Sequence, residues 1–175
     1  MSQPDQSRGT DAAPEVIWVG PFTVGAMLKH CLDDDLPKPP ASKSAYLVSE
    51  HRWKGKPTAA CRPLYVGGTT GKSERLRTRI GDLVADLFGF FTDTTGHHSG
   101  GYKLHCYCRE HKISPLALFI GWVLDAPCHR CLEVELHKVY KSSLLNNHRL
   151  EAGGFDSRLK ARPSADPRGA PYVSQ

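Results

Sequence analysis

"LYVGGTTGKSERLRTRI", residues 64–80, decides how the chain is expected to fold. It opens with an apolar run typical of a strand, which ends at Gly67 and Gly68. A helical pattern then starts at Ser73, a good N-cap residue, and continues to about residue 91. The apolar side chains that recur every three or four positions there are Leu76, Ile80, Leu83, Val84 and Leu87. The stretch therefore predicts a strand, a glycine turn and a helix with one buried face.

The same stretch contains Gly-Lys-Ser at 71–73, which resembles the end of a phosphate-binding loop. A Walker loop places four residues between its first glycine and that ending, because the backbone N–H groups must wrap a phosphate. Only three residues follow Gly67 before the ending, and starting one residue earlier puts Val66 where glycine is required. Asp125, after a later apolar strand, imitates the acidic magnesium ligand of such enzymes. A P-loop-like NTPase is therefore kept only as a minor alternative.

Composition predicts one soluble domain. The chain has 175 residues, 39% of them hydrophobic and 23% charged, which is enough for a core of its own. It has no apolar run of membrane-spanning length and no export signal, so we expect a cytoplasmic protein without membrane contact. The formal charge of +5 permits a polyanionic partner without requiring one. Six cysteines without an export signal favour reduced thiols or metal ligands over a disulfide framework.

Pattern along the chain predicts an α/β (α+β) sandwich in which helices flank a small antiparallel or mixed three-stranded central sheet. The expected strands are 44–50, 63–67 and 115–124, with a further extended piece at 102–108, and the expected helices are 22–32, 73–91 and 131–145. The expected divisions are a disordered N-terminus (1–15), an N-terminal helix and linker (16–40), the main domain (41–150) and a basic disordered tail (151–175).

Five short patterns occur in order within residues 43–147. They are Ser44-Ala45-Tyr46, Tyr65-Val66-Gly67, Leu76-x-x-Arg79, Glu133-x-x-Leu136 with Tyr140, and a final Leu145-Asn146. In order and in strand or helix context they resemble the GIY-YIG nuclease family, where two strands carry the name-giving tripeptides. A helix with a fixed Arg follows in that family, and then a helix with an acidic metal ligand. The resemblance implies a GIY-YIG-like endonuclease domain over 41–150 that acts on DNA.

Phosphodiester hydrolysis explains the residue types. The resemblance implies that Glu133 holds Mg²⁺ or Mn²⁺, an ion for which one carboxylate, waters and the substrate phosphate can suffice. Arg79 offers a permanently charged planar fork for a phosphate oxygen. Tyr46 and Tyr65 are expected to line the cleavage site and contact the attacking water or the scissile phosphate. Glu135 is the other candidate metal ligand.

Further residues are expected to contact the substrate. Gly67 and Gly68 would let the DNA backbone approach the strand end closely, because they carry no Cβ. Lys72 and Arg77 would make salt-sensitive contacts to phosphates. Asn146 would steady the site or cap the helix, and Asn147 is a near-equal choice. Because one active centre nicks a single strand, the resemblance leaves open a monomer or a homodimer.

The sequence departs from the family at two points. Family members usually carry His or Tyr four residues after the Arg, where this chain has Leu83, and the Lys expected shortly after the second glycine is missing. The loop GHHSGG supplies a possible replacement. We expect His98, rather than His97, to assist proton transfer from that loop near neutral pH.

The assignments to single residues have structural alternatives. Tyr46 and Tyr65 could be ordinary strand aromatics, and Arg79 could be a surface helix charge. Glu133 could instead pair with His137, one helical turn further along.

The cysteines allow a second metal hypothesis. On an extended segment Cys106 and Cys108 would point the same way, and with Cys128 and Cys131 they could close a structural zinc tetrahedron. Buried small hydrophobic side chains are the other interpretation. A non-catalytic DNA-binding or zinc-stabilised interaction module of the same fold is therefore the functional alternative to the nuclease.

Overall fold

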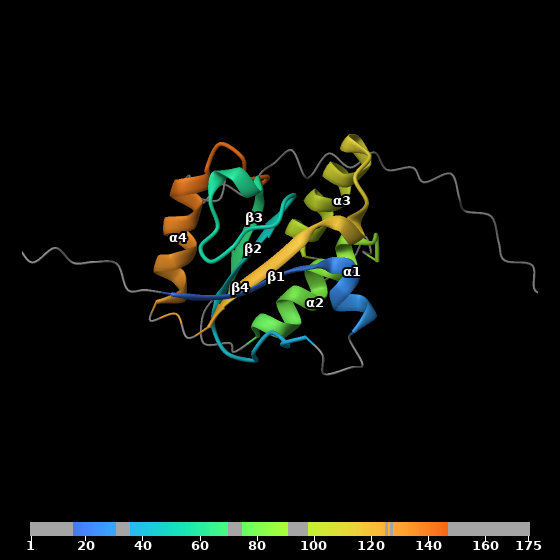
Figure 1. Cartoon of the computed structure of the whole chain (residues 1–175). Helices are drawn as coiled ribbons and strands as arrows, with labels where there is room; N and C mark the ends of the chain where they lie inside the picture. Colours follow the sequence, from blue (N-terminus) through green and yellow to red (C-terminus); the bar gives the residue numbers. More distant parts are fainter. Residues whose placement is uncertain are drawn as a thin grey trace, which may run out of the picture.

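The computed structural model describes residues 16–30, 36–69, 75–90, 98–124, 126 and 128–146. They form one four-stranded antiparallel sheet in the order β1-β4-β2-β3, with α2 and α3 on one face and α4 on the other (Figure 1). The strands are β1 (Ile17–Thr23), β2 (Ala45–Ser49), β3 (Pro63–Gly68) and β4 (Phe119–Leu124). The helices are α1 (Val24–Lys29), α2 (Leu76–Leu87), α3 (Ser99–His111) and α4 (His129–Tyr140), with short 3-10 turns η1 (Ala59–Cys61) and η2 (Pro115–Ala117).

The predicted α/β class is confirmed, but the expectation of three strands is wrong. The fourth strand is β1, in the segment where the pattern predicts only a helix and a linker. β1 pairs with β4 along the sheet edge, and its register shifts between Val19 and Phe22. That interval contains Gly20-Pro21, a pair typical of turns, which hides the strand pattern in the sequence. The N-terminal helix begins after Thr23, which caps it by accepting a hydrogen bond from the Ala26 N–H at 3.0 Å, and it ends at Lys29.

Two cores lie on opposite faces of the sheet. Successive side chains of β2 alternate between them, so Tyr46 and Val48 face α2 and α3 while Ala45 and Leu47 face α4. The first core includes Leu76, Ile80, Leu83, Leu87 and Leu104, and the second includes Val66, Leu136, Tyr140 and Leu144. Because both faces of β2 are covered, all five of its residues are buried.

Helix α3 replaces the predicted extended segment at 102–108. Leu104 and Cys108, four residues apart, lie on its buried face. Gly101 lets α3 approach α2, since a Cβ there would lie 2.5 Å from the Leu83 carbonyl oxygen. The paired glycines at the helix start disfavour a helix by propensity, and this contact with α2 overrides that preference.

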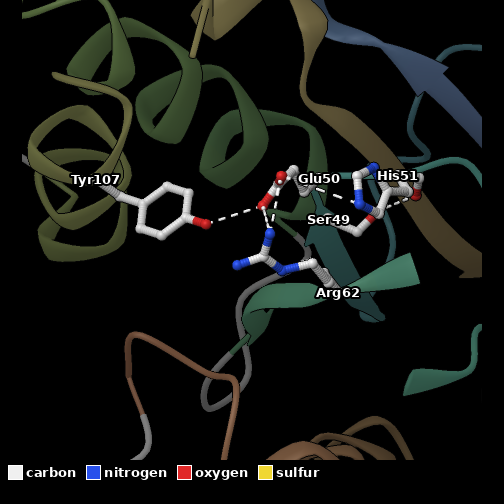
Figure 2. A network of polar contacts seen from close by, with 5 residues as sticks. All are labelled: Ser49, Glu50, His51, Arg62 and Tyr107. Atoms are coloured by element: carbon white, nitrogen blue, oxygen red, sulfur yellow. Dashed lines mark hydrogen bonds and ion pairs between the residues drawn. The ribbon is translucent and has the colours of Figure 1, made fainter. Parts of the chain in front are cut away.

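A polar network fixes α3 to the β2–β3 hairpin (Figure 2). The Tyr107 hydroxyl donates to Glu50 Oε2 at 2.8 Å, and Arg62 Nη1 lies 3.1 Å from the same carboxylate. Ser49 donates to the His51 carbonyl beside it. The charge of Glu50 also acts on Cys108 of α3. Burial is the main cause, and this charge the second, of a pKa raised to about 11 for the Cys108 thiol.

The outer edge of β3 is covered by the chain that follows α4. The Leu145 N–H donates to the Leu64 carbonyl at 2.8 Å, and Asn146 Nδ2 donates to the Val66 carbonyl at 2.8 Å. These bonds satisfy backbone groups that an edge strand otherwise leaves open. Among the helices that the structure describes, none is long and apolar enough to cross a membrane.

Candidate active site

Tyr46 and Tyr65 lie side by side on the face of the sheet that packs against α2 and α3. Tyr46 is opposite Gly67 in the β2–β3 register, and the two tyrosine ring centroids are 6.0 Å apart. A Cβ at position 67 would lie 2.5 Å from the Tyr46 ring, so Gly67 makes room for that ring. Both tyrosines are almost completely buried. They are therefore packed into the core, and Gly67 has a packing role that the sequence does not predict.

His98 joins the tyrosine pair at the N-terminus of α3. Its Nδ1 accepts a hydrogen bond from the Gly100 N–H at 3.2 Å, which makes His98 the N-cap of the helix. Its Nε2 lies 3.0 Å from the Tyr46 hydroxyl oxygen. The ring is buried at the start of a helix rather than exposed in the expected loop.

The backbone bond determines the tautomer of His98. Because Nδ1 accepts from Gly100, the proton of the neutral ring sits on Nε2 and is donated to the Tyr46 oxygen. Both ring nitrogens are then engaged. In this arrangement neutral His98 can hold Tyr46 in place, but it has no acceptor nitrogen left for a proton from water.

Arg79 reaches the same point from α2. Its Nη2 lies 3.4 Å from His98 Nε2. Because Nε2–H donates to Tyr46, this is a close contact between two donor groups. The Arg79 Nε atom is buried and has no hydrogen-bond acceptor within the described part of the chain. Arg79 is thus a partly buried cation turned toward the tyrosines rather than a surface helix charge.

Glu133 approaches from α4, on the opposite side of the sheet, at the end of β3. A Cβ on Gly68 would lie 2.7 Å from Glu133 Oε2, so the absence of a side chain at position 68 admits the carboxylate. The charge of Glu133 is among those that act on Tyr46. Glu135, the other candidate ligand, is exposed and lines a separate cavity of about 710 Å³ between α4 and β1.

Tyr46, Tyr65, His98 and Arg79 contact one another in turn, and the charge of Glu133 acts on Tyr46 from the end of β3. We call these five side chains the tyrosine cluster. The pKa of Tyr46 is raised well above 10, mainly by burial and next by Tyr65, while Arg79 opposes the shift. Tyr46 therefore keeps its proton at neutral pH. The phenol can donate a hydrogen bond but is not poised to act as a base.

The other predicted residues lie elsewhere. Arg77 is exposed, and its Nε donates to the Pro39 carbonyl at 2.8 Å. Asn146 is buried against the β3 backbone and serves that strand edge. Leu83, where the family carries His or Tyr, belongs to the core between the sheet and α2. Several positions of the sequence hypotheses lie outside the described residues: Gly71, Lys72, Ser73, His97, Asp125 and Asn147.

The four cysteines do not form the expected tetrahedron. Cys106 is exposed and Cys108 buried, because they lie two apart on a helix rather than on a strand. Cys128 and Cys131 form a disulfide at the start of α4, contrary to the expectation that the thiols are reduced. Within the described ranges no group of three or more His, Cys, Asp or Glu side chains is placed to share a metal ion.

Gly100 supports the tyrosine cluster although it belongs to none of the five sequence patterns. A Cβ at Gly100 would lie 2.3 Å from the Tyr65 ring, so Gly100 makes room for the tyrosine, and its N–H also donates to the capping His98. The Gly-Gly pair after His98 is the signal that could have indicated this close approach.

Neither a protein-family model, nor a curated protein, nor a solved structure matches the chain. The functional conclusion therefore depends on these residues alone.

Proposed function

We propose that the protein is a metal-dependent endonuclease of the GIY-YIG type, which hydrolyses DNA phosphodiester bonds at the tyrosine cluster. The observation that carries the proposal is that the charges of Arg79 and Glu133 both act on Tyr46, while Glu133 Oε2 lies beside Gly68 at the end of β3. Arg79 comes from α2 and Glu133 from α4, on opposite faces of the sheet (Figure 1). A phosphate binder and a metal ligand beside neutral phenols suit phosphodiester chemistry.

In this reaction water adds to phosphorus while the bond to one sugar oxygen breaks. Arg79 is only partly buried, and its guanidinium would bind a nonbridging phosphate oxygen. Tyr46 would keep its proton and, being fully buried, would support the site from within the core rather than act on the water. His98 would position Tyr46 rather than take up a proton.

A single carboxylate fits the metal that the family resemblance implies. Glu133 would hold Mg²⁺ or Mn²⁺, because such ions are often bound by one carboxylate together with substrate phosphate and waters. The bound ion would lower the pKa of its water and neutralise charge on the phosphate. One cluster per chain would cut one strand at a time, so nicking is the expected product.

A non-catalytic DNA-binding module is the second candidate. It is favoured by the burial of both tyrosines and by the placement of Leu83 in the core, where the family has a polar residue. In that case Arg79 would bind phosphate without cleavage. Metal-dependent nicking distinguishes the two candidates.

The experiment compares supercoiled plasmid nicking in Mg²⁺ by the wild type, Glu133→Gln and Glu135→Gln. Both substitutions remove one carboxylate from α4, but only Glu133 lies at the cluster. We expect Glu133→Gln to lose at least about 100-fold in rate, as removal of a single charge-stabilising group does elsewhere. Glu135→Gln should cut like the wild type.

Arg79→Lys is the second test, since it keeps the charge but not the planar fork. It should cut slowly while the thermal melt stays close to that of the wild type. Cleavage that survives both Glu133→Gln and Arg79→Lys would reject the site. A wild type that binds duplex DNA but does not nick it would support the non-catalytic module.

A further inference from the structure

The start of α4 carries a pair of sulfurs that the proposed nuclease does not use. Cys128 and Cys131 are joined as a disulfide across one helical turn, and both residues are exposed. They also line the cavity of about 710 Å³ between α4 and β1, together with Trp18, Lys56 and Tyr140. A thiol in solution can therefore approach either sulfur.

The link contributes little to holding the fold together. It closes a loop of one helical turn, so it constrains the unfolded chain far less than a link between distant elements does. It joins no two elements of the fold, and α4 is attached to the sheet by buried Leu136 and Tyr140. Stabilisation of the fold therefore does not account for this disulfide.

The surroundings of Cys128 suit a thiolate. Cys128 is the N-cap of the twelve-residue helix α4, and its Sγ accepts a hydrogen bond from the Cys131 N–H at 3.1 Å. A negative sulfur there would face the positive end of the helix dipole, with Arg130 as a neighbour in the chain. Thiolates in Cys-x-x-Cys pairs at helix N-termini are the ones that exchange readily.

We propose that Cys128 and Cys131 form a reversible thiol–disulfide exchange site whose co-substrate is a thiol reductant. The proposal is independent of the nuclease. A thiolate of the reductant attacks Cys131 Sγ, the bond between the two protein sulfurs breaks, and Cys128 leaves as the thiolate that the Cys131 N–H holds. A second thiol, from the same dithiol or from a second molecule of a monothiol such as glutathione, then attacks the mixed disulfide and releases Cys131. Two electrons pass to the protein, two protons complete its thiols, and the reductant becomes a disulfide.

The first experiment counts thiols on the folded full-length chain. The protein used carries Cys31→Ser and Cys106→Ser. These changes remove the exposed thiol of Cys106 and the thiol of Cys31, which lies outside the described residues. The protein is equilibrated with glutathione at graded ratios of its reduced and oxidised forms, trapped with N-ethylmaleimide and weighed by mass spectrometry. We expect two labels to appear together as the buffer becomes more reducing and to disappear again on reoxidation.

Three outcomes of that experiment overturn the proposal. The pair could stay unlabelled until the protein is denatured, which means an inert link. Reduction could unfold the chain, which circular dichroism detects and which means a structural link. Labelling could require a zinc chelator, which means that the sulfurs are metal ligands.

The second experiment tests which sulfur reacts. In Cys131→Ser the thiol of Cys128 is free, and exposed Cys106 in the middle of α3 is an internal reference in the same molecule. We expect iodoacetamide at pH 7 to modify Cys128 about tenfold faster than Cys106, because the helix end favours the thiolate. Equal or slower modification of Cys128 would overturn its assignment as the reactive sulfur.

Discussion

Replacing Gly100 by alanine tests whether the tyrosine cluster is packed as described. Glycine inside a helix costs about 0.5–1 kcal/mol relative to alanine, so propensity alone predicts that Gly100→Ala stabilises the protein. The new Cβ would, however, lie 2.3 Å from the Tyr65 ring. That ring is buried and cannot move away, because it packs beside Tyr46 and His98.

The clash outweighs the propensity gain. Overpacking of this kind costs about 1–3 kcal/mol, so a net loss of up to about 2.5 kcal/mol is expected. Gly81→Ala is the matched control, since Gly81 lies within α2 and no atom comes within 4 Å of a Cβ placed there. Gly81→Ala should gain about 0.5–1 kcal/mol.

Thermal and urea unfolding of the two variants measure this difference. A change of 1 kcal/mol shifts the melting temperature of a domain of this size by about 4 °C, so the variants should move in opposite directions by several degrees. The comparison is informative because both changes add the same methyl group to a helix. If Gly100→Ala melts at or above the temperature of the wild type, the close seating of Tyr65 on α3 is wrong.

Two further predictions concern the edge of β3 and the pH dependence of stability. Asn146→Ala should lower the free energy of unfolding by about 1–3 kcal/mol and speed amide exchange near Val66, because the buried Val66 carbonyl loses its donor. A loss of stability no larger than that of the exposed control Ser142→Ala would contradict this role of Asn146. The unfolded chain releases a thiol proton near pH 9, whereas folded Cys108 keeps it to about pH 11, so the free energy of unfolding should fall as pH rises between these values. Cys108→Ala should flatten that fall in urea titrations and Cys106→Ala should not; equal slopes in all three proteins would refute the raised pKa.

Local pattern determined much of the fold. The apolar period over 73–91 predicts a helix, and the structure has one from Leu76 to Leu87. The apolar runs of β2, β3 and β4 are likewise strands, because buried strands need continuous apolar side chains and little else. Where a segment's period and its surroundings agree, the sequence is sufficient.

Local pattern fails where a tertiary contact overrides it. Gly20-Pro21 reads as a turn, yet β1 continues past it because β4 offers a partner strand. The segment after His98 reads as a loop and an extended piece, yet it is helix α3, whose glycines allow contact with α2 and Tyr65. The pairing with β4 has no signature in the residues themselves, and the Gly100-Gly101 pair signals a close approach without indicating which element approaches.

The candidate site divides in the same way. The sequence, through its resemblance to a nuclease family, pointed to Tyr46, Tyr65, Arg79 and Glu133. Only the tertiary structure decided that Glu133 rather than Glu135 reaches the end of β3, and that His98 is fixed as a helix cap. The physical reason is that side-chain direction depends on how α4 and α3 sit on the sheet, and that placement follows from packing over the whole core rather than from any short stretch.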